Sequence, residues 1–79
     1  MESKFSDNFI AMTVRAGFAA APEITEQDLR DTAEEQRPDI YDEWWGQETP
    51  ELRASTSLEA YRAMMLERVI KQLRLIKAG

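Results

Sequence analysis

Three prolines limit where this chain can form regular structure. Pro22, Pro38 and Pro50 each lack a backbone N–H, so none fits the interior of a helix or of a central strand. Between them, apolar residues recur at three- and four-residue spacing, and no run alternates apolar and polar residues as a half-buried strand would. The sequence therefore predicts an all-α fold, a small helical bundle of three main helices plus a short helix in third position.

The length of the chain, 79 residues, limits the size of its core. It predicts a single helical domain over residues 1–79 with a net stability of roughly 3 to 5 kcal/mol. The chain has no cysteine, whereas secreted domains of this size often need disulfides, so we expect a cytoplasmic protein. No segment approaches the ~20 apolar residues that span a bilayer, so we expect no membrane partner.

The first helix is expected to begin at Ser3 or Ser6, whose hydroxyls can cap it, and to run to about Ala20 before Pro22. Its apolar residues lie almost all round it. We therefore predict that it is central and packed on more than one side. One stripe comprises Phe5, Phe9, Met12, Ala16 and Ala19, and the other faces carry Ile10, Val14 and Phe18.

The second helix has the clearest start in the chain. Thr25 is its predicted cap, with Asp28 placed to bond back to it, and Ile24 and Leu29 are spaced for a hydrophobic staple. Beyond Leu29 and Ala33 this helix has almost no apolar surface. It is predicted to be a thin outer helix that meets the core along a narrow seam.

Two short helices are expected in the middle of the chain. The first runs from Asp39 to Trp45, with Pro38 in its first turn, and Gly46 ends it in the left-handed conformation. The second starts at Pro50 with Thr49 as its cap and continues for at most one turn.

The last helix is capped by Thr56, in a capping box with Glu59, or alternatively by Ser57, and runs for about 20 residues to Lys77. Arg62 projects into its apolar face. Because a buried arginine needs a carboxylate, we expect an internal ion pair with the acidic middle of the chain. Met64 and Leu75 fall on the opposite, charged side. The wide apolar face comprises Leu58, Tyr61, Met65, Leu66, Val69, Ile70, Leu73 and Ile76.

The net charge of −5 conceals an internal division. From Glu23 to Glu51 there are eleven acidic residues against Arg30 and Arg37, which gives −9. From residue 53 to the end there are six basic residues against two acidic ones, which gives +4. An acidic block followed by a basic helix favours pairing between the two, and the net negative field argues against direct nucleic-acid binding.

The residue types present exclude much catalytic chemistry. Without histidine and cysteine there is no Ser-His-Asp or Cys-His system and no zinc site of those ligands. Carboxylate chemistry remains, but the spacing of the acids matches neither a calcium loop nor a di-iron bundle. We therefore expect no catalytic residues, no cofactor and no metal, and a protein that is not an enzyme.

The stretch PDIYDEWWGQ carries the candidate binding surface. On a helix, Ile40, Tyr41, Trp44 and Trp45 fall within one arc and the acids take the other side. Most of the aromatic cluster is expected to anchor this helix, with at least one tryptophan ring partly exposed among carboxylates. The predicted partner-binding residues are Glu34, Glu35, Asp39, Tyr41, Asp42, Glu43, Trp44 and Trp45.

These features lead to two hypotheses of function. The first is a non-enzymatic protein-binding module, an inhibitor or adaptor, that occupies a basic site on a partner protein of the kind that binds nucleic acid. In size and charge alone, the chain resembles small acidic inhibitors carried by phages, anti-CRISPR proteins among them, and bacteriocin immunity proteins. The alternative is an accessory subunit that forms a homodimer or docks on a larger assembly through the C-terminal helix, with Met64 and Leu75 in the interface.

Overall fold

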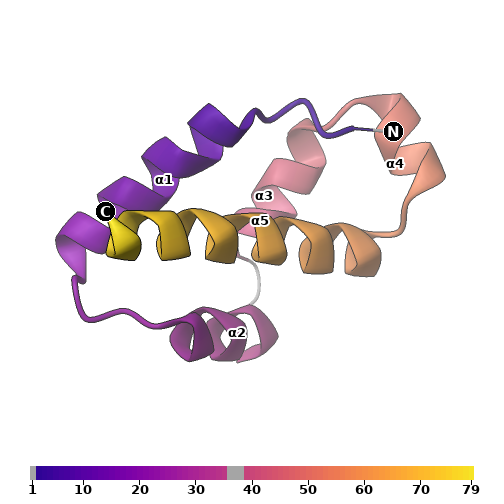
Figure 1. The fold of residues 1–79 in the computed structure, drawn as a ribbon. Coiled ribbons are helices and arrows are strands. Elements are labelled where there is room, and N and C mark those ends of the chain that lie inside the picture. Colours follow the sequence, from indigo (N-terminus) through magenta and orange to yellow (C-terminus); the bar gives the residue numbers. More distant parts are fainter. Residues whose placement is uncertain (1, 36–38) are drawn as a thin grey trace.

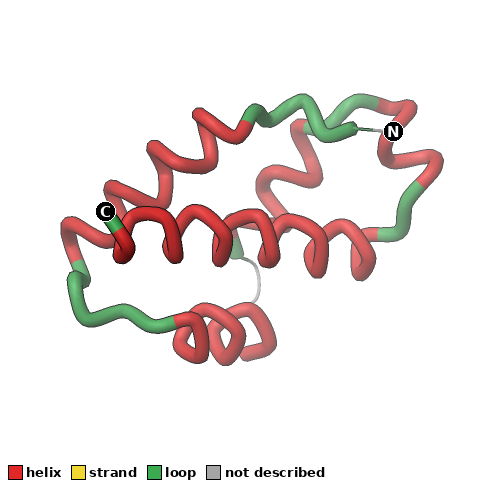
Figure 2. The backbone as a smooth tube through the Cα atoms, viewed as in Figure 1, coloured by secondary structure: helices red, strands yellow, loops and turns green. Residues whose placement is uncertain are grey.

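The computed structural model describes residues 2–35 and 39–79 of the chain. This part of the chain is helical, with helices joined by short loops and no strand (Figure 2). The all-α prediction is therefore confirmed. The helices are α1 (Asp7–Ala20), α2 (Glu26–Glu35), α3 (Ile40–Gln47), α4 (Pro50–Ser55) and α5 (Leu58–Ala78).

The helix α5 forms the centre of the molecule. In Figure 1, α1 and α3 lie above α5 and α2 lies below it, and all three contact α5. The Cα atoms extend 36 × 26 × 15 Å, so the molecule is flat and the outer helices pack mainly on α5. The apolar face predicted for α5 is buried, with Leu58, Leu66 and Ile76 at its margins. Its buried residues are Tyr61, Met65, Val69, Ile70 and Leu73.

The predicted central position of α1 is wrong. Its buried residues are Ile10, Ala11 and Val14, whereas Phe9 is 41% and Met12 is 63% exposed. Because α1 packs against α5 along one side, only residues at the spacing of Ile10 and Val14 reach the core. The predicted stripe therefore faces solvent along α1, and of its members only Phe5, which precedes the helix, is buried.

Side-chain caps begin the helices where local sequence indicates. Ser6 accepts a hydrogen bond from the Phe9 amide at 3.1 Å, so the later of the two predicted starts of α1 is the real one. The capping box of α2 is confirmed, because the Asp28 amide donates to Thr25 and the Thr25 amide donates to Asp28. Ser57 caps α5 by accepting from the Ala60 amide, so the alternative to Thr56 is correct.

The predicted end of α3 is wrong. Gly46 lies inside α3, which continues to Gln47, and the chain leaves the helix at Glu48 in an extended conformation, φ −69° and ψ 163°. One local and one long-range requirement fix this exit. Thr49 immediately caps α4 by accepting from the Leu52 amide, and the Glu48 side chain is held in the interior. No left-handed residue is needed, and α4 has six residues rather than a single turn. The predicted role of Pro38 lies outside the described residues.

Candidate functional site

The centre of the candidate site is Arg62, a buried residue of α5. Its Nη1 donates to Asp39 Oδ1 at 2.7 Å and to Asp42 Oδ1 at 2.8 Å. Its Nη2 donates to Asp39 Oδ2 at 2.7 Å and to the carbonyl oxygen of Ala33 at 2.6 Å. The expected ion pair between Arg62 and the acidic block is confirmed. A single guanidinium thus ties the end of α2 and the start of α3 to α5.

Asp39 has a second role as the cap of α3. Its Oδ1 accepts from the amides of Tyr41 at 3.0 Å and Asp42 at 3.3 Å, and its own amide donates to Asp42 Oδ2. Burial alone would raise the pKa of the Asp39 carboxyl, but the hydrogen bonds from Arg62 and from these amides outweigh it and hold that pKa below its ordinary value. The carboxylate is therefore charged and fixed in position at neutral pH.

Three further carboxylates lie on the two helices that Arg62 joins to α5. Glu34 and Glu35 follow Ala33 at the end of α2, and Glu43 follows Asp42 on α3; all three are exposed. None of them forms an ion pair within residues 2–35 and 39–79. We call these three together with Asp39 and Asp42 the acidic patch. Asp39 and Asp42 contact the Arg62 guanidinium, and Glu34, Glu35 and Glu43 add three exposed carboxylates beside them in the sequence.

The aromatic residues of the candidate site divide into buried and accessible ones. Tyr41 and Trp44 are buried, and their rings meet edge to face with centroids 5.8 Å apart. Burial raises the pKa of the Tyr41 phenol to about 12. Trp45 is only partly buried, and its ring centroid lies 5.1 Å from that of Tyr61. Of the three aromatic candidates, therefore, only Trp45 is available to a partner.

Trp44 anchors α3 to the N-terminal part of the chain. Its ring centroid lies 5.6 Å from that of Phe5 and 5.9 Å from that of Phe9, and the two phenylalanine rings stack at 5.0 Å. Replacing so large a buried ring costs about 3–5 kcal/mol in typical cores. Trp44 is therefore a structural residue, and a variant of it would report on folding rather than on binding.

Glu48 is a buried carboxylate whose role the sequence did not indicate. Its Oε2 accepts from the Tyr61 hydroxyl at 2.6 Å and from the Ser3 hydroxyl, and its Oε1 accepts from the Lys4 amide at 3.0 Å. Burial would raise the pKa of the Glu48 carboxyl, but these donors outweigh it and lower that pKa. Burial, and then the same carboxylate, raise the pKa of Tyr61 well above its ordinary value. Glu48 therefore fastens the N-terminal segment to α5.

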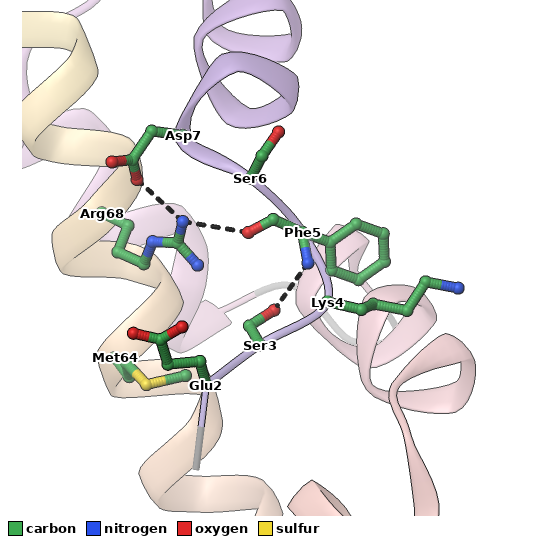
Figure 3. A pocket seen from close by; sticks show the side chains of 8 residues that line it. All are labelled: Glu2, Ser3, Lys4, Phe5, Ser6, Asp7, Met64 and Arg68. Carbon is green, nitrogen blue, oxygen red and sulfur yellow. Dashed lines mark hydrogen bonds and ion pairs between the residues drawn. The ribbon is translucent and has the colours of Figure 1, made fainter.

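Beside this segment, the structure has a polar hollow of about 610 Å³ (Figure 3). Arg68 donates across it to the Phe5 carbonyl oxygen at 3.0 Å and to Asp7 at 2.8 Å, whereas the Lys4 side chain points away along the Phe5 ring. Two acids, Glu2 and Asp7, balance two bases here, and the Arg68 guanidinium is already paired. The hollow has no net charge that would select a ligand.

The arginines of α5 are paired with acids elsewhere in the chain. Arg62 binds the acidic patch, Arg74 binds Glu26, and Arg68 binds Asp7. In one further pair the roles are exchanged: Arg30 of α2 supplies the cation and Glu67 of α5 the carboxylate, at 2.8 Å. The expected pairing of the basic helix with the acidic block therefore holds for Arg62 and Arg74.

Two further features bear on ligands. Within the described residues, no group of three or more acidic side chains has an arrangement that would hold a metal ion. No described helix is both long enough and apolar enough to pass through a membrane.

Comparison of the chain with protein-family models, curated proteins and solved structures found no match.

Proposed function

We propose that this chain is a non-enzymatic protein-binding module of the cytoplasm, an inhibitor or adaptor, whose acidic patch occupies a basic site on a partner protein. The observation that carries the proposal is the arrangement around Arg62. It holds Asp39 and Asp42 rigidly, and the exposed acids Glu34 and Glu35 directly follow Ala33, whose carbonyl it also binds. Arg62 thereby joins the end of α2 to the start of α3, the two segments that carry the exposed acids, and a pre-ordered surface binds with a smaller loss of conformational freedom.

The charge of the patch determines the kind of partner. The patch belongs to residues 23–51, which carry a formal charge of −9, and such a charge steers a basic surface toward it and accelerates association. A protein site that binds the phosphates of nucleic acid has the complementary charge. A partner of that type would be blocked when this chain occupies its site, which is the action of an inhibitor.

Trp45 supplies an apolar contact near the patch. It lies three residues after Asp42 on α3, so the two side chains are neighbours on the helix surface. Tryptophan is among the residues that most often dominate binding energy, particularly when charged or polar groups surround it. We therefore place the partner contact over the acidic patch and the exposed edge of Trp45.

The alternative, docking through the C-terminal helix, has one observation in its favour. Met64 is 36% exposed and Leu75 is 58% exposed, both on the side of α5 away from the core. Lys71 lies between them on that side and is also exposed, so the apolar surface is interrupted. This arrangement supports a smaller and weaker contact than the acidic patch does.

The test is affinity capture from a lysate of the source organism with three forms of the protein. The first is unchanged, the second carries Glu34→Gln, Glu35→Gln and Glu43→Gln, and the third is a control of equal net charge. Capture should be lost with the second form and retained with the third. Equal capture by all three forms, together with loss in a Met64→Ser, Leu75→Ser variant, would instead favour docking through α5. The control carries Glu2→Gln, Glu23→Gln and Glu51→Gln, all at exposed positions.

A further inference from the structure

An apolar groove of about 160 Å³ opens between α1 and α3. Thr13 and Gly17 of α1 line one wall, Ile40 and Trp44 of α3 line the other, and Val69 and Leu73 of α5 form the floor. Among the residues that the structure describes, no charged one lines the groove. Ile24 of the α1–α2 loop and Leu29 of α2 complete the lining, so four helices that pack around one core shape the groove before any ligand arrives.

The groove is accessible to solvent. Ile40 is 39% exposed at one edge, and Gly17 is exposed at the other. A Cβ atom placed on Gly17 would meet no heavy atom within 4 Å, so the space beside this residue is open. An uncharged, open groove of this kind loses water readily to an apolar group of matching size.

The groove adjoins an acidic hollow. Ile40 lines both, and the remaining residues of the hollow are Asp39, Asp42 and Glu43. No lysine or arginine within residues 2–35 and 39–79 lines either of them. Because Arg62 already binds Asp39 and Asp42, Glu43 is the carboxylate here that forms no ion pair within the described part of the chain.

We propose that this groove receives one large apolar side chain from a basic segment of the partner protein, with a lysine or arginine of the same segment placed against Glu43. The inference rests on the proposed function, because it assigns a specific contact to the basic partner. An apolar cavity of about 150 Å³ accommodates a benzene-sized molecule. The groove therefore has room for a single leucine, methionine or phenylalanine side chain.

Charge complementarity selects this occupant over a second copy of the chain. A second copy carries a net charge of −5, so two copies repel each other at long range. A segment that combines an apolar side chain with a cation gains from both the groove and Glu43. A purely apolar or an acidic segment would gain from the groove alone.

The test uses two small probes that share an apolar group and differ in charge, 4-phenylbutylammonium and 4-phenylbutyrate. Each is titrated into the full chain labelled with ¹⁵N, and the amides of Thr13, Gly17 and Ile40 and the indole of Trp44 are followed by NMR. The ammonium probe should shift these signals and bind roughly three- to tenfold more tightly than the carboxylate probe at low salt. Glu43→Gln should reduce this preference, whereas Glu51→Gln, at an exposed site on α4, should leave it unchanged.

Two glycines provide a matched pair of variants. Gly17 and Gly46 both lie within helices, and a Cβ on either meets open space, but only Gly17 lines the groove. Gly17→Leu should fill the groove and abolish the shifts, while Gly46→Leu should leave them intact. Both variants should melt at or above the temperature of the unchanged protein, because leucine favours a helix more than glycine does. Loss of probe binding in a Gly17→Leu protein of undiminished melting temperature thus cannot be attributed to unfolding.

Three results would overturn the inference. They are the absence of shifts with either probe, equal affinity for both probes, and a concentration-dependent dimer that Gly17→Leu dissociates, since the occupant would then be a second copy. Capture experiments distinguish failure of the groove contact from failure of the proposed function. If Gly17→Leu protein captures the partner with unchanged affinity, only the groove contact is wrong. If the acidic-patch variant captures it normally, the proposed function is wrong, whatever the probes show.

Discussion

Arg62 and Asp39 form a two-pronged ion pair in which Nη1 donates to Oδ1 and Nη2 to Oδ2, each at 2.7 Å. The side chains of both residues are less than a tenth exposed, at 8% and 9%. Because the same carboxylate caps α3, the pair connects the start of this helix to the centre of α5. The position of the acidic patch depends on this connection.

Removing the guanidinium should destabilise the fold strongly. Arg62→Ala leaves the buried carboxylate of Asp39 and the carbonyl of Ala33 without their cation, and breaking a buried pair in this way costs about 3–5 kcal/mol. Asp39→Asn should cost less than Arg62→Ala, because asparagine retains the capping ability of the residue. Urea unfolding followed by circular dichroism measures both. If Arg62→Ala lowered the free energy of unfolding by less than about 1 kcal/mol, the pair would not be what holds α3 in place.

Glu48 should control the order of the N-terminal segment. Glu48→Gln changes the acceptor for Tyr61, Ser3 and the Lys4 amide, and leaving such buried groups poorly paired costs about 1–3 kcal/mol. Hydrogen exchange at the Lys4 and Phe5 amides should accelerate more than exchange within α2. Glu51→Gln is the control, because this carboxylate is exposed and should alter stability by less than about 0.5 kcal/mol.

Acid should destabilise the protein through two carboxyls, Asp39 and Glu48. Both have pKa values lowered by folding, so the folded state binds fewer protons than the unfolded state near their ordinary values of 3.8 and 4.5. The stabilisation is complete above these values and is lost as the pH falls below them toward the folded-state pKa. The urea concentration at the unfolding midpoint, measured from pH 7 downward, should decrease over this pH range. The decrease should be smaller in a Glu48→Gln, Asp39→Asn double variant. A pH-independent midpoint in both proteins would contradict this assignment.

Alkali should destabilise the protein through its tyrosines, Tyr41 and Tyr61. Folding raises the pKa of both, that of Tyr41 to about 12, so the folded state retains phenolic protons that the unfolded state releases near pH 10. Stability is therefore complete below pH 10 and declines above it. The chain has no other tyrosine, so phenolate absorbance reports on these two alone. This absorbance should appear together with the loss of helical circular dichroism, and phenolate in a fully helical protein would refute the prediction.

The local features of the fold could be predicted from the sequence. Ser6, Thr25 and Ser57 cap helices through bonds to residues three positions away, so the chemistry of each helix start is contained in a few consecutive residues. The ion pair of Arg62 could be predicted in kind, because an arginine on an apolar face needs an acid. Which of the eleven acids of the block it binds depends on how α2 and α3 pack, and the sequence does not specify that.

The features that were missed depend on contacts between distant residues. Phe9 and Met12 have the spacing of a buried stripe, but α1 turns the other side, with Ile10 and Val14, toward α5. In the sequence, Glu48 looks like any other acid of its block. Its partners Ser3 and Tyr61 lie 45 and 13 positions away, so no local pattern indicates that it is buried.

In the candidate site, the aromatic helix and its acids could be predicted as a unit. Trp44 is buried because Phe5 and Phe9 cover its ring, whereas Trp45 meets Tyr61 of α5 and stays partly exposed, and only the structure gives these contacts.

The central claim is that the acidic patch binds a basic partner, and the most direct measurement is the dissociation constant of the captured partner as a function of salt. For the unchanged protein, it should rise by roughly tenfold or more between about 50 and 300 mM salt, because salt screens the attraction between the two surfaces. The protein carrying Glu34→Gln, Glu35→Gln and Glu43→Gln should bind weakly with a shallow salt dependence, while the control of equal net charge should resemble the unchanged protein. A dissociation constant that is independent of salt, or equally weak binding by both triple variants, would contradict the claim.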